Sequence, residues 1–403
     1  MKLDPPDPTR WGCSVPSSGS NSYTLDASQN LAEAIKKAKA GDVINLASGN
    51  YGAVSVNGPR FTSFVTIQAA PGAQAVLTFL HVNSASHMIF KNLKIQSQAT
   101  ADKQYQKLVL VQAGNSGNAS DNIVFEGNDI SSVDDSAAWS LADWLAHGQW
   151  TGLTVDGGAD SNGAQSFVSC ISVLHNKIHD VRIGVSIGAI KTLFQGNTID
   201  RFGDDALDYA ASDIVIRDNT ITNAINIGDG NHPDAMQGQI GRSKRYSNIL
   251  IDGNTVIRQT ISGLKFSGPL QGIDAFDSDW YNITVTHNKV TTDSYHGISY
   301  ASIHTANISN NIVHFDGSPS GKFTWLMVSA KTHAGSTSDH VLVKDNVVDR
   351  LSIQIPAVPE SVIAEHNTCS QQLAYQDEKG KAFWQSKPGV YNVGSETGNL
   401  VGN

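Results

Sequence analysis

One short phrase recurs along this chain and constrains its fold more than any other feature. In each copy, spaced apolar residues precede an asparagine, and an Ile or Val follows two positions later in every copy but the last. A typical copy reads Ile-Val-Ile-Arg-Asp-Asn219, followed by Thr-Ile. The asparagines of the nine copies are Asn128, Asn176, Asn197, Asn219, Asn254, Asn288, Asn311, Asn346 and Asn367.

The spacing of these asparagines predicts a repeat architecture. Successive positions lie 48, 21, 22, 35, 34, 23, 35 and 21 residues apart, so the base period is near 22, with insertions. That period fits a coil of three short strands and three bends, and not a pair of helices. Alternate side chains of each strand would point inward. Asparagines at one bend could stack into a hydrogen-bonded ladder.

Composition agrees with such a coil and excludes some partners. The chain has 403 residues, 40% hydrophobic and only 16% charged, which predicts one elongated domain of roughly a dozen coils. The net charge of −9 argues against nucleic acid as a partner. The sequence contains no run of 18 apolar residues, so we expect no membrane span. Three cysteines are too few for a disulfide framework, so Cys170 and Cys369 are predicted to be core residues and the redox compartment stays open.

The two ends differ from the repeat. Residues 1–27 read as an extended lead-in without the pattern of a signal peptide. Residues 28–40 predict an amphipathic helix, ended by Gly41, that would cap the open end of the coil. The repeat then extends to residue 370. Residues 371–403 lose the phrase and are predicted to cover the far end.

The stretch after this helix carries a family resemblance. It reads GDVINLASGNY from Gly41, FVTIQAAPGAQAVL from Phe64 and HMIFKNLKI from His87. This order resembles the opening of the right-handed parallel β-helix proteins, the pectin-lyase-like superfamily, and the resemblance covers residues 28–370. It implies an all-β, single-stranded right-handed parallel β-helix. The superfamily includes polysaccharide lyases, glycoside hydrolases, uronate epimerases, phage tailspikes and non-catalytic binders, so the fold alone does not decide activity.

A second strand phrase lies between consecutive asparagines, and the insertions flank it on both sides. Insertions on one face of a solenoid build walls around a groove, so this strand is predicted to be the groove floor. Its fourth position should point outward and reads Thr154, Ser186, Asp208, Gln237, Asp274, Ser299 and Met327. Its first position reads Asp205, Asp234, Gln271 and His296. Strict alternation would turn the first position inward, but at a bend we assign it to the groove.

Acidic residues of this floor suggest hydrolytic chemistry. Asp208 and Asp274 are expected two strands apart, roughly 9.6 Å at the backbone. Their side chains could reach the ~6.5–9.5 Å used by inverting glycosidases. Asp205 and Asp234 would be nearer, at about 5 Å, where one carboxyl is forced to stay protonated or both bind a cation. The Asp204-Asp205 pair followed by Asp208 resembles the paired aspartates of β-helix glycoside hydrolases. The alternative is that Asp204 and Asp205 form only a polar bend.

A second hypothesis is β-elimination or C5 epimerisation of a uronate glycan. His232-Pro233-Asp234 loosely resembles the Asp-Pro-His motif of β-helix alginate epimerases and lyases. His232 or Lys265 would be the base. Arg242 and Lys244 lie in a wall and could neutralise the substrate carboxylate, as could Ca²⁺ held by Asp205, Asp208 and Asp234. The hydrolase hypothesis requires no cofactor.

Tryptophans near the insertions suggest stacking on sugar rings. They are Trp139, Trp144 and Trp150 in the longest insertion, with Trp280 and Trp325 near other walls. Gln237, Gln271 and His296 are predicted to add polar substrate contacts. The sequence therefore predicts a polysaccharide depolymerase, narrowly favoured as a carboxylate-based hydrolase, with a uronate lyase or epimerase second. A non-catalytic glycan-binding or tailspike-type β-helix is the third possibility. We expect an extracellular or virion-associated protein, monomeric, or homotrimeric if it is a phage spike.

Overall fold

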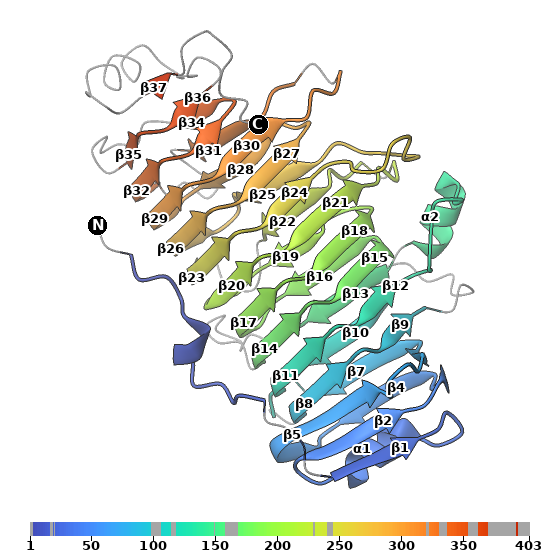
Figure 1. The fold of residues 1–403 in the computed structure, drawn as a ribbon. Helices are drawn as coiled ribbons and strands as arrows, with labels where there is room; N and C mark the ends of the chain where they lie inside the picture. The colour runs from blue at the N-terminus through green and yellow to red at the C-terminus, as the bar shows by residue number, and fades with distance from the viewer. Residues whose placement is uncertain are drawn as a thin grey trace.

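The computed structural model describes residues 3–16, 19, 21–97, 106–113, 118–148, 150–157, 168–228, 230–239, 245–319, 322–329, 337–353, 362–369 and 392–393. Three long parallel sheets wind around one apolar core (Figure 1). The fold is the predicted right-handed parallel β-helix. No helix in the described part of the chain is long and apolar enough to span a membrane.

Each coil contributes one strand to each sheet, and the strands have the following bounds. Sheet A contains β1 (Asn21–Leu25), β2 (Asp42–Leu46), β5 (Arg60–Ala69), β8 (Ser86–Lys91), β11 (Asp121–Glu126), β14 (Ser169–Leu174), β17 (Ile190–Gln195), β20 (Ile214–Arg217), β23 (Arg245–Asp252), β26 (Asp279–Thr286), β29 (Ile303–Ser309), β32 (Asp339–Lys344) and β35 (Val362–Glu365). Sheet B contains β3 (Gly49–Asn50), β6 (Ala75–Leu77), β9 (Lys94–Gln96), β12 (Asp129–Ser131), β15 (Lys177–Val181), β18 (Thr198–Phe202), β21 (Thr220–Ala224), β24 (Thr255–Ile257), β27 (Lys289–Thr292), β30 (Ile312–Phe315), β33 (Val347–Val348), β36 (Thr368–Cys369) and β37 (Asn392–Val393). Sheet C contains β4 (Ala53–Asn57), β7 (Phe79–Asn83), β10 (Gln106–Gln112), β13 (Trp150–Val155), β16 (Ile183–Ile187), β19 (Leu207–Tyr209), β22 (Asp234–Gly238), β25 (Gln271–Ala275), β28 (His296–Ala301), β31 (Trp325–Ser329) and β34 (Leu351–Ile353).

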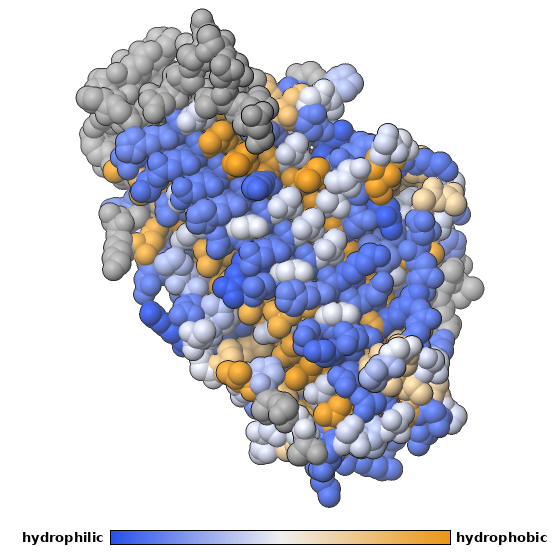
Figure 2. Space-filling view, in the orientation of Figure 1, coloured by the Kyte–Doolittle hydropathy of each residue, from blue (hydrophilic) through white to orange (hydrophobic). Residues whose placement is uncertain are grey.

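The apolar positions of all three sheets form one continuous core from Leu25 to Ala364. The face drawn in Figure 2 is mostly hydrophilic, with smaller hydrophobic patches between the polar residues. This division follows from the alternation of side chains along a strand, which gives each strand one inner and one outer face. The hydrophobic effect of burying the inner face is what holds successive coils together.

The predicted asparagine ladder is present at the bend between sheets A and B. All nine asparagines are buried, with at most 2% of their surface exposed. From Asn176 onward, each side-chain oxygen accepts two hydrogen bonds from the preceding asparagine, as Asn254 Oδ1 does from the backbone N–H (3.0 Å) and Nδ2 (2.9 Å) of Asn219. Asn254 Nδ2 donates in turn to Asn288 Oδ1 at 2.9 Å and to the Ile216 carbonyl at 3.0 Å.

The residue before each ladder asparagine has a left-handed backbone. The nine φ angles lie between 54° and 67°, at Gly127, His175, Gly196, Asp218, Gly253, His287, Asn310, Asp345 and His366. Gly adopts this region freely, and Asn, Asp and His are the other residues that enter it most readily. The repeated phrase therefore specifies the bend twice, by the buried amide and by the residue before it.

Insertions fall on both sides of the sheet C strands, as predicted. β15 and β16 are separated by one residue, whereas nine residues separate β21 from β22 and thirteen separate β24 from β25. The longest, between β12 and β13, contains helix α2 (Leu141–His147), capped by reciprocal hydrogen bonds between Ser140 and Asp143. Sheet C is thus the only strand set whose two flanks are both enlarged in the described coils.

The N-terminal segment is tied to the outside of sheet A. It contains the 3₁₀ turn η1 (Pro8–Arg10) and runs along the starts of the sheet A strands (Figure 1). We call residues 11–14 the strap. Cys13 forms a disulfide with Cys170, Lys191 Nζ donates to the Trp11 carbonyl at 2.9 Å, and the Ser14 N–H donates to Asn122 Oδ1 at 2.8 Å.

The disulfide corrects the prediction that Cys170 is a core cysteine. The register places Ile171 in the core, so the neighbouring Cys170 faces outward, with a left-handed φ of 57°. Asn122 and Lys191 occupy the equivalent left-handed position in adjacent coils, so the strap follows one column of outward side chains. The side chain of Cys369 lies outside the described residues.

Helix α1 (Leu31–Lys37) forms the N-terminal cap and is shorter than the predicted 28–40. Asn30 caps it by accepting from the Glu33 N–H at 3.0 Å, and Leu31 and Ile35 are buried. β1, from the predicted lead-in, pairs with β2 as the first strand of sheet A. The predicted C-terminal tail lies outside the described residues except for β37.

Candidate active site

The strand register aligns the predicted floor residues in one outward column. Thr154 pairs with Ser186, Ser186 with Asp208 and Asp208 with Gln237. Gln237 then pairs with Asp274, and Asp274 with Ser299. The third-position residues between them are fully buried in the core. Asp208 and Asp274 therefore lie two strands apart in the column predicted to form the groove floor, with Gln237 between them.

First-position residues reach the same outer face, despite strict alternation. Asp234 Oδ2 accepts from Gln237 Nε2 at 2.9 Å, and His296 Nδ1 lies 3.0 Å from Ser299 Oγ. The carboxyl groups of Asp205 and Asp208 hydrogen bond to each other. Each contact joins the first and fourth positions of one strand phrase. The bend entering the strand thus rotates the first side chain onto the floor.

Four carboxyl groups gather in this part of sheet C, and burial raises the pKa of all four. Asp205 has its pKa raised by burial and by the charges of Asp208, Asp234 and Asp204. Burial raises the pKa of Asp208 to about 7, which the nearby charges of Asp204 and Asp234 also favour, and Gln239 donates to its Oδ1 at 3.3 Å. Asp208 is the member of this group that remains partly exposed to solvent. A carboxyl that holds its proton near neutral pH is suited to act as a general acid.

Asp274 is enclosed more completely than the sequence predicted. None of its surface is exposed, and neither carboxylate oxygen has a hydrogen-bond partner among the described residues. Burial, with the charges of Asp234, Asp277 and Asp208, raises its pKa well above the ordinary value. In this conformation Asp274 has no access to a substrate. The structure thus brings Asp208 and Asp274 into one column but leaves only Asp208 open to the groove.

His232 and Asp234 form a dyad beside this group. His232 Nδ1 lies 3.1 Å from Asp234 Oδ2, and the His232 side chain is 61% exposed. The hydrogen bond with Asp234 raises the pKa of His232 despite partial burial. The backbone N–H of Asp234 donates to Asp205 Oδ1 at 3.0 Å, so the dyad is linked to the acidic group. A carboxylate that orients one imidazole nitrogen leaves the other available as a base.

An aromatic surface borders the acidic group on the C-terminal side. The rings of Tyr295 and Trp325 stack with centroids 5.4 Å apart, and Phe323 meets Trp325 edge-on at 5.4 Å. Trp325 Nε1 donates to Ser299 Oγ at 3.2 Å. Burial lowers the pKa of His296 to about 4, so its imidazole is neutral beside this surface. Exposed aromatic faces with polar groups at their edges suit sugar rings.

The fold is shared with known proteins, although no family model and no curated protein matches the sequence. The structure of the PL6 family alginate lyase AlyGC aligns with a TM-score of 0.52 and 12% identity, over 89% of this chain and 52% of AlyGC. The Dettilon tailspike protein aligns with a TM-score of 0.50 and 11% identity, over 87% of this chain and 66% of that chain. This chain has the parallel β-helix fold of both proteins. At such identities the likeness concerns the fold, and this chain spans about half of AlyGC.

Several predicted site residues of this β-helix lie away from the acidic group. Lys265 lies with Trp139 and Trp144 at a separate cavity next to sheet B. Trp150 and Trp280 are buried core residues and do not line the groove, which corrects their predicted role. Gln271 is half-buried on the floor. Arg242 and Lys244 lie outside the described residues.

The predicted calcium ligands do not fit a cation in this arrangement. No three His, Cys, Asp or Glu side chains converge as a metal site in the described part of the chain. Asp205 and Asp208 bond to each other, and Asp234 Oδ2 is shared by His232 and Gln237. Asp234 Oδ1 has no partner among the described residues, but one unpartnered oxygen is no cation site, so we derive no step through Ca²⁺.

Sequence reasoning missed Gln239, Tyr295 and Phe323, and left Trp325 out of the floor. Gln239 follows β22 by one residue and bonds to both Asp208 and Gln237. The two other aromatic residues lie in the bends before β28 and β31. Tyr295 and Phe323 each stand one position before the first residue of a strand phrase, His296 and Thr324 respectively, and this shared position is the signal that could have found them.

Proposed function

We propose that this protein is a polysaccharide-active enzyme that hydrolyses glycosidic bonds in the groove over β19, β22 and β25. The observation that carries the proposal is Asp208, a partly exposed carboxyl on the groove floor with a pKa of about 7. Fully ionised carboxylates cannot donate a proton to a leaving oxygen, whereas a carboxyl protonated near neutral pH can. Its neighbours supply the low dielectric and the negative charge that keep the proton in place.

In this mechanism Asp208 donates its proton to the glycosidic oxygen as the bond to the anomeric carbon breaks. His232, oriented by Asp234, removes a proton from the attacking water. Asp205 holds its own proton and donates a hydrogen bond to Asp208, which fixes the orientation of the Asp208 carboxyl group. Direct attack of water inverts the anomeric configuration, so the proposal predicts an inverted product. The sequence predicted Asp208 and Asp274 as the acid and base. His232 takes the role of the base here, because Asp274 is fully buried and cannot reach a water in the groove.

Elimination or epimerisation is the second candidate, and the His232–Asp234 dyad favours it, because an oriented imidazole could take a C5 proton. A uronate substrate also needs a cation to neutralise its carboxylate. The floor column between Thr154 and Met327 contains no Lys or Arg, and its described centre is acidic. Lys265, the other predicted base, lies elsewhere. We therefore rank hydrolysis first.

Incubation of the purified protein with a panel of neutral and acidic polysaccharides tests this. We expect new reducing ends without absorbance near 235 nm, and a loss of roughly 10²–10⁴-fold in rate for Asp208→Asn. Asp252→Asn, a carboxylate on the outer face of sheet A, is the matched control and should keep full activity. Products that absorb near 235 nm would replace hydrolysis by elimination. Glycan binding without any cleavage would instead identify a non-catalytic binder.

We infer an extracellular or virion-associated location with a polysaccharide as the partner. The Cys13–Cys170 disulfide supports this, because disulfides persist mainly in oxidising environments. The monomeric or trimeric state stays a prediction, which light scattering of the purified chain would test.

A further inference from the structure

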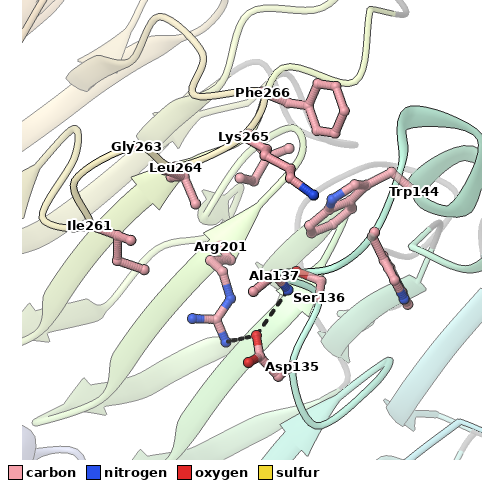
Figure 3. Close-up of a pocket in the computed structure, with 12 residues that line it drawn as sticks. Asp135, Ser136, Ala137, Trp144, Arg201, Ile261, Gly263, Leu264, Lys265 and Phe266 are labelled. Carbon is pink, nitrogen blue, oxygen red and sulfur yellow. Dashed lines mark hydrogen bonds and ion pairs between the residues drawn. The ribbon is translucent and has the colours of Figure 1, made fainter.

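A cavity of about 260 Å³ lies beside sheet B, among the insertions that precede the sheet C strands. Its walls come from the turn after β12, helix α2, the end of β18 and the loop after β24 (Figure 3). The acidic group belongs to sheet C and to the bends that enter it. The cavity is thus a separate site, and nothing in the proposed hydrolysis uses it.

One side of the cavity is aromatic. The rings of Trp139 and Trp144 meet edge-to-face with centroids 5.2 Å apart, and Trp144 packs on the buried Ile225 and Ile227. Opposite them the loop presents Ile261 and Phe266, which are 39% and 37% exposed. Side chains this apolar at an open rim favour a ligand that has an apolar face of its own.

The cavity has two positively charged side chains, Arg201 and Lys265, and only Arg201 is paired with carboxylates among the described residues. Arg201 is balanced, because its Nε and Nη2 lie 2.7 Å from the two oxygens of Asp180 and its Nη1 lies 2.8 Å from Asp200. Asp135 adds a longer contact to Arg201 at 3.9 Å. Lys265 is exposed and has no carboxylate within ion-pair distance among the described residues. Figure 3 shows its amine reaching toward the Trp144 side of the cavity. The cavity therefore offers one uncompensated positive charge beside an aromatic wall.

We propose that this cavity binds one carboxylated sugar ring as an accessory site outside the cleavage groove. The C–H face of the ring would stack on Trp139, and its carboxylate would pair with Lys265. Asp135 and Arg201 at the opposite edge match hydroxyl groups. The volume suits a single ring, being below the range of about 300–1,000 Å³ that takes drug-sized ligands. The choice of a sugar rests on the proposed function, whereas the cavity and its charge do not.

The test compares probes that differ only in the carboxylate. Saturation-transfer NMR and calorimetry would use the methyl glycosides of glucuronate, galacturonate and mannuronate, each against its neutral hexose counterpart. We expect at least one uronide to bind roughly tenfold more tightly than its neutral partner. Lys265→Gln should abolish this preference, and Trp139→Ala should weaken binding of both probes by about tenfold or more. Lys37→Gln, an exposed lysine on α1, is the matched control and should change nothing.

Two results would overturn the proposal: no uronide binds at up to about 20 mM, or Lys265→Gln leaves the preference for the carboxylate intact. Lys265→Gln keeps the test decisive if Trp139→Ala misfolds, because Lys265 is exposed and makes no core contact. Asp208→Asn separates this site from the groove. It should retain uronide binding while losing hydrolysis, so either proposal can fail without the other.

Discussion

The β-helix contains two columns of polar side chains that differ in how fully their hydrogen bonds are satisfied. At the bend between sheets A and B, the amides of nine asparagines stack and satisfy one another. On sheet C, the carboxyl column contains Asp274 with both oxygens unpartnered, and Asp234 with one. The asparagine column repeats once per coil, whereas the carboxyl groups are confined to the coils of β19, β22 and β25. Both columns are largely buried, yet one is saturated with hydrogen bonds and the other is not.

The difference follows from the groups themselves. An amide both donates and accepts, so identical amides can stack indefinitely, whereas an ionised carboxylate only accepts. Stacked carboxylates can coexist only if some of them hold protons or find donors. An amide column therefore stabilises a solenoid, and an acidic column costs stability. Such a cost is typical of functional sites, where it sets protonation states.

Breaking the amide column should have the largest effect on stability. Asn254→Ala leaves the Asn219 N–H and the Ile216 carbonyl without their partners in a buried bend. With a penalty of about 1–3 kcal/mol per group and a small cavity, we expect a loss of about 5 kcal/mol. Chemical denaturation would measure it. Asn57→Ala, at an exposed asparagine of β4, should stay within about 0.5 kcal/mol, and a similar loss there would contradict the distinction.

The disulfide of the strap stabilises the fold from outside both columns. The Cys13–Cys170 bond closes a sequence separation of 157 residues, so replacing both cysteines by serine should cost about 3 kcal/mol. The groove is on another sheet, so activity at a permissive temperature should be unchanged. Dithiothreitol should lower the melting temperature of the native chain but not of the double variant. If glycan cleavage also falls, the strap is coupled to the groove.

The acidic column should reveal itself through pH. A carboxyl whose pKa is raised on folding contributes stability that is present below its unfolded pKa and lost as pH rises through its folded pKa. For Asp208 that value is about 7. Between about pH 5 and 8 the native chain should lose about 2 kcal/mol relative to Asp208→Asn. His296, with a pKa lowered to about 4, acts in the opposite direction, but both proteins contain it, so its contribution cancels in the comparison. Parallel pH profiles for the two proteins would contradict the raised pKa.

Asp274→Asn should have the smallest effect, and its sign is the informative part. The substitution removes a group that cannot ionise cheaply, so stability at pH 8 should rise by about 1 kcal/mol. The gain is small because the new amide donors also lack partners among the described residues. A matched Asn254→Asp exchange in the ladder should instead destabilise. A loss of stability in Asp274→Asn would mean that the carboxylate has a donor in solution.

The periodic part of this molecule could be predicted from the sequence, and the rest could not for a physical reason. The asparagine phrase repeats because each coil solves the same bend, so register and floor column follow from counting. Asp208 could be placed outward by that counting. The enclosure of Asp274 could not, because it depends on what covers the outer face.

The loops and the strap are not periodic, so counting residues could not predict where their side chains lie. Lys265 and Trp139 belong to insertions that directly precede floor strands in the sequence. The fold nevertheless places both at the cavity beside sheet B. Cys13 and Cys170 are 157 residues apart, and nothing local identifies them as partners. Only the path of the strap along the outward column of sheet A brings them together.

The left-handed residue before each ladder asparagine has a consequence for mutational scanning. Most of these positions are exposed, so solvent accessibility alone would class them as tolerant. A β-branched residue there would cost about 1–2 kcal/mol from the backbone alone. A library of all single substitutions should therefore show nine intolerant surface sites, each one residue before a buried asparagine. Enrichment data of that kind would count the coils of a homologous solenoid without any structure.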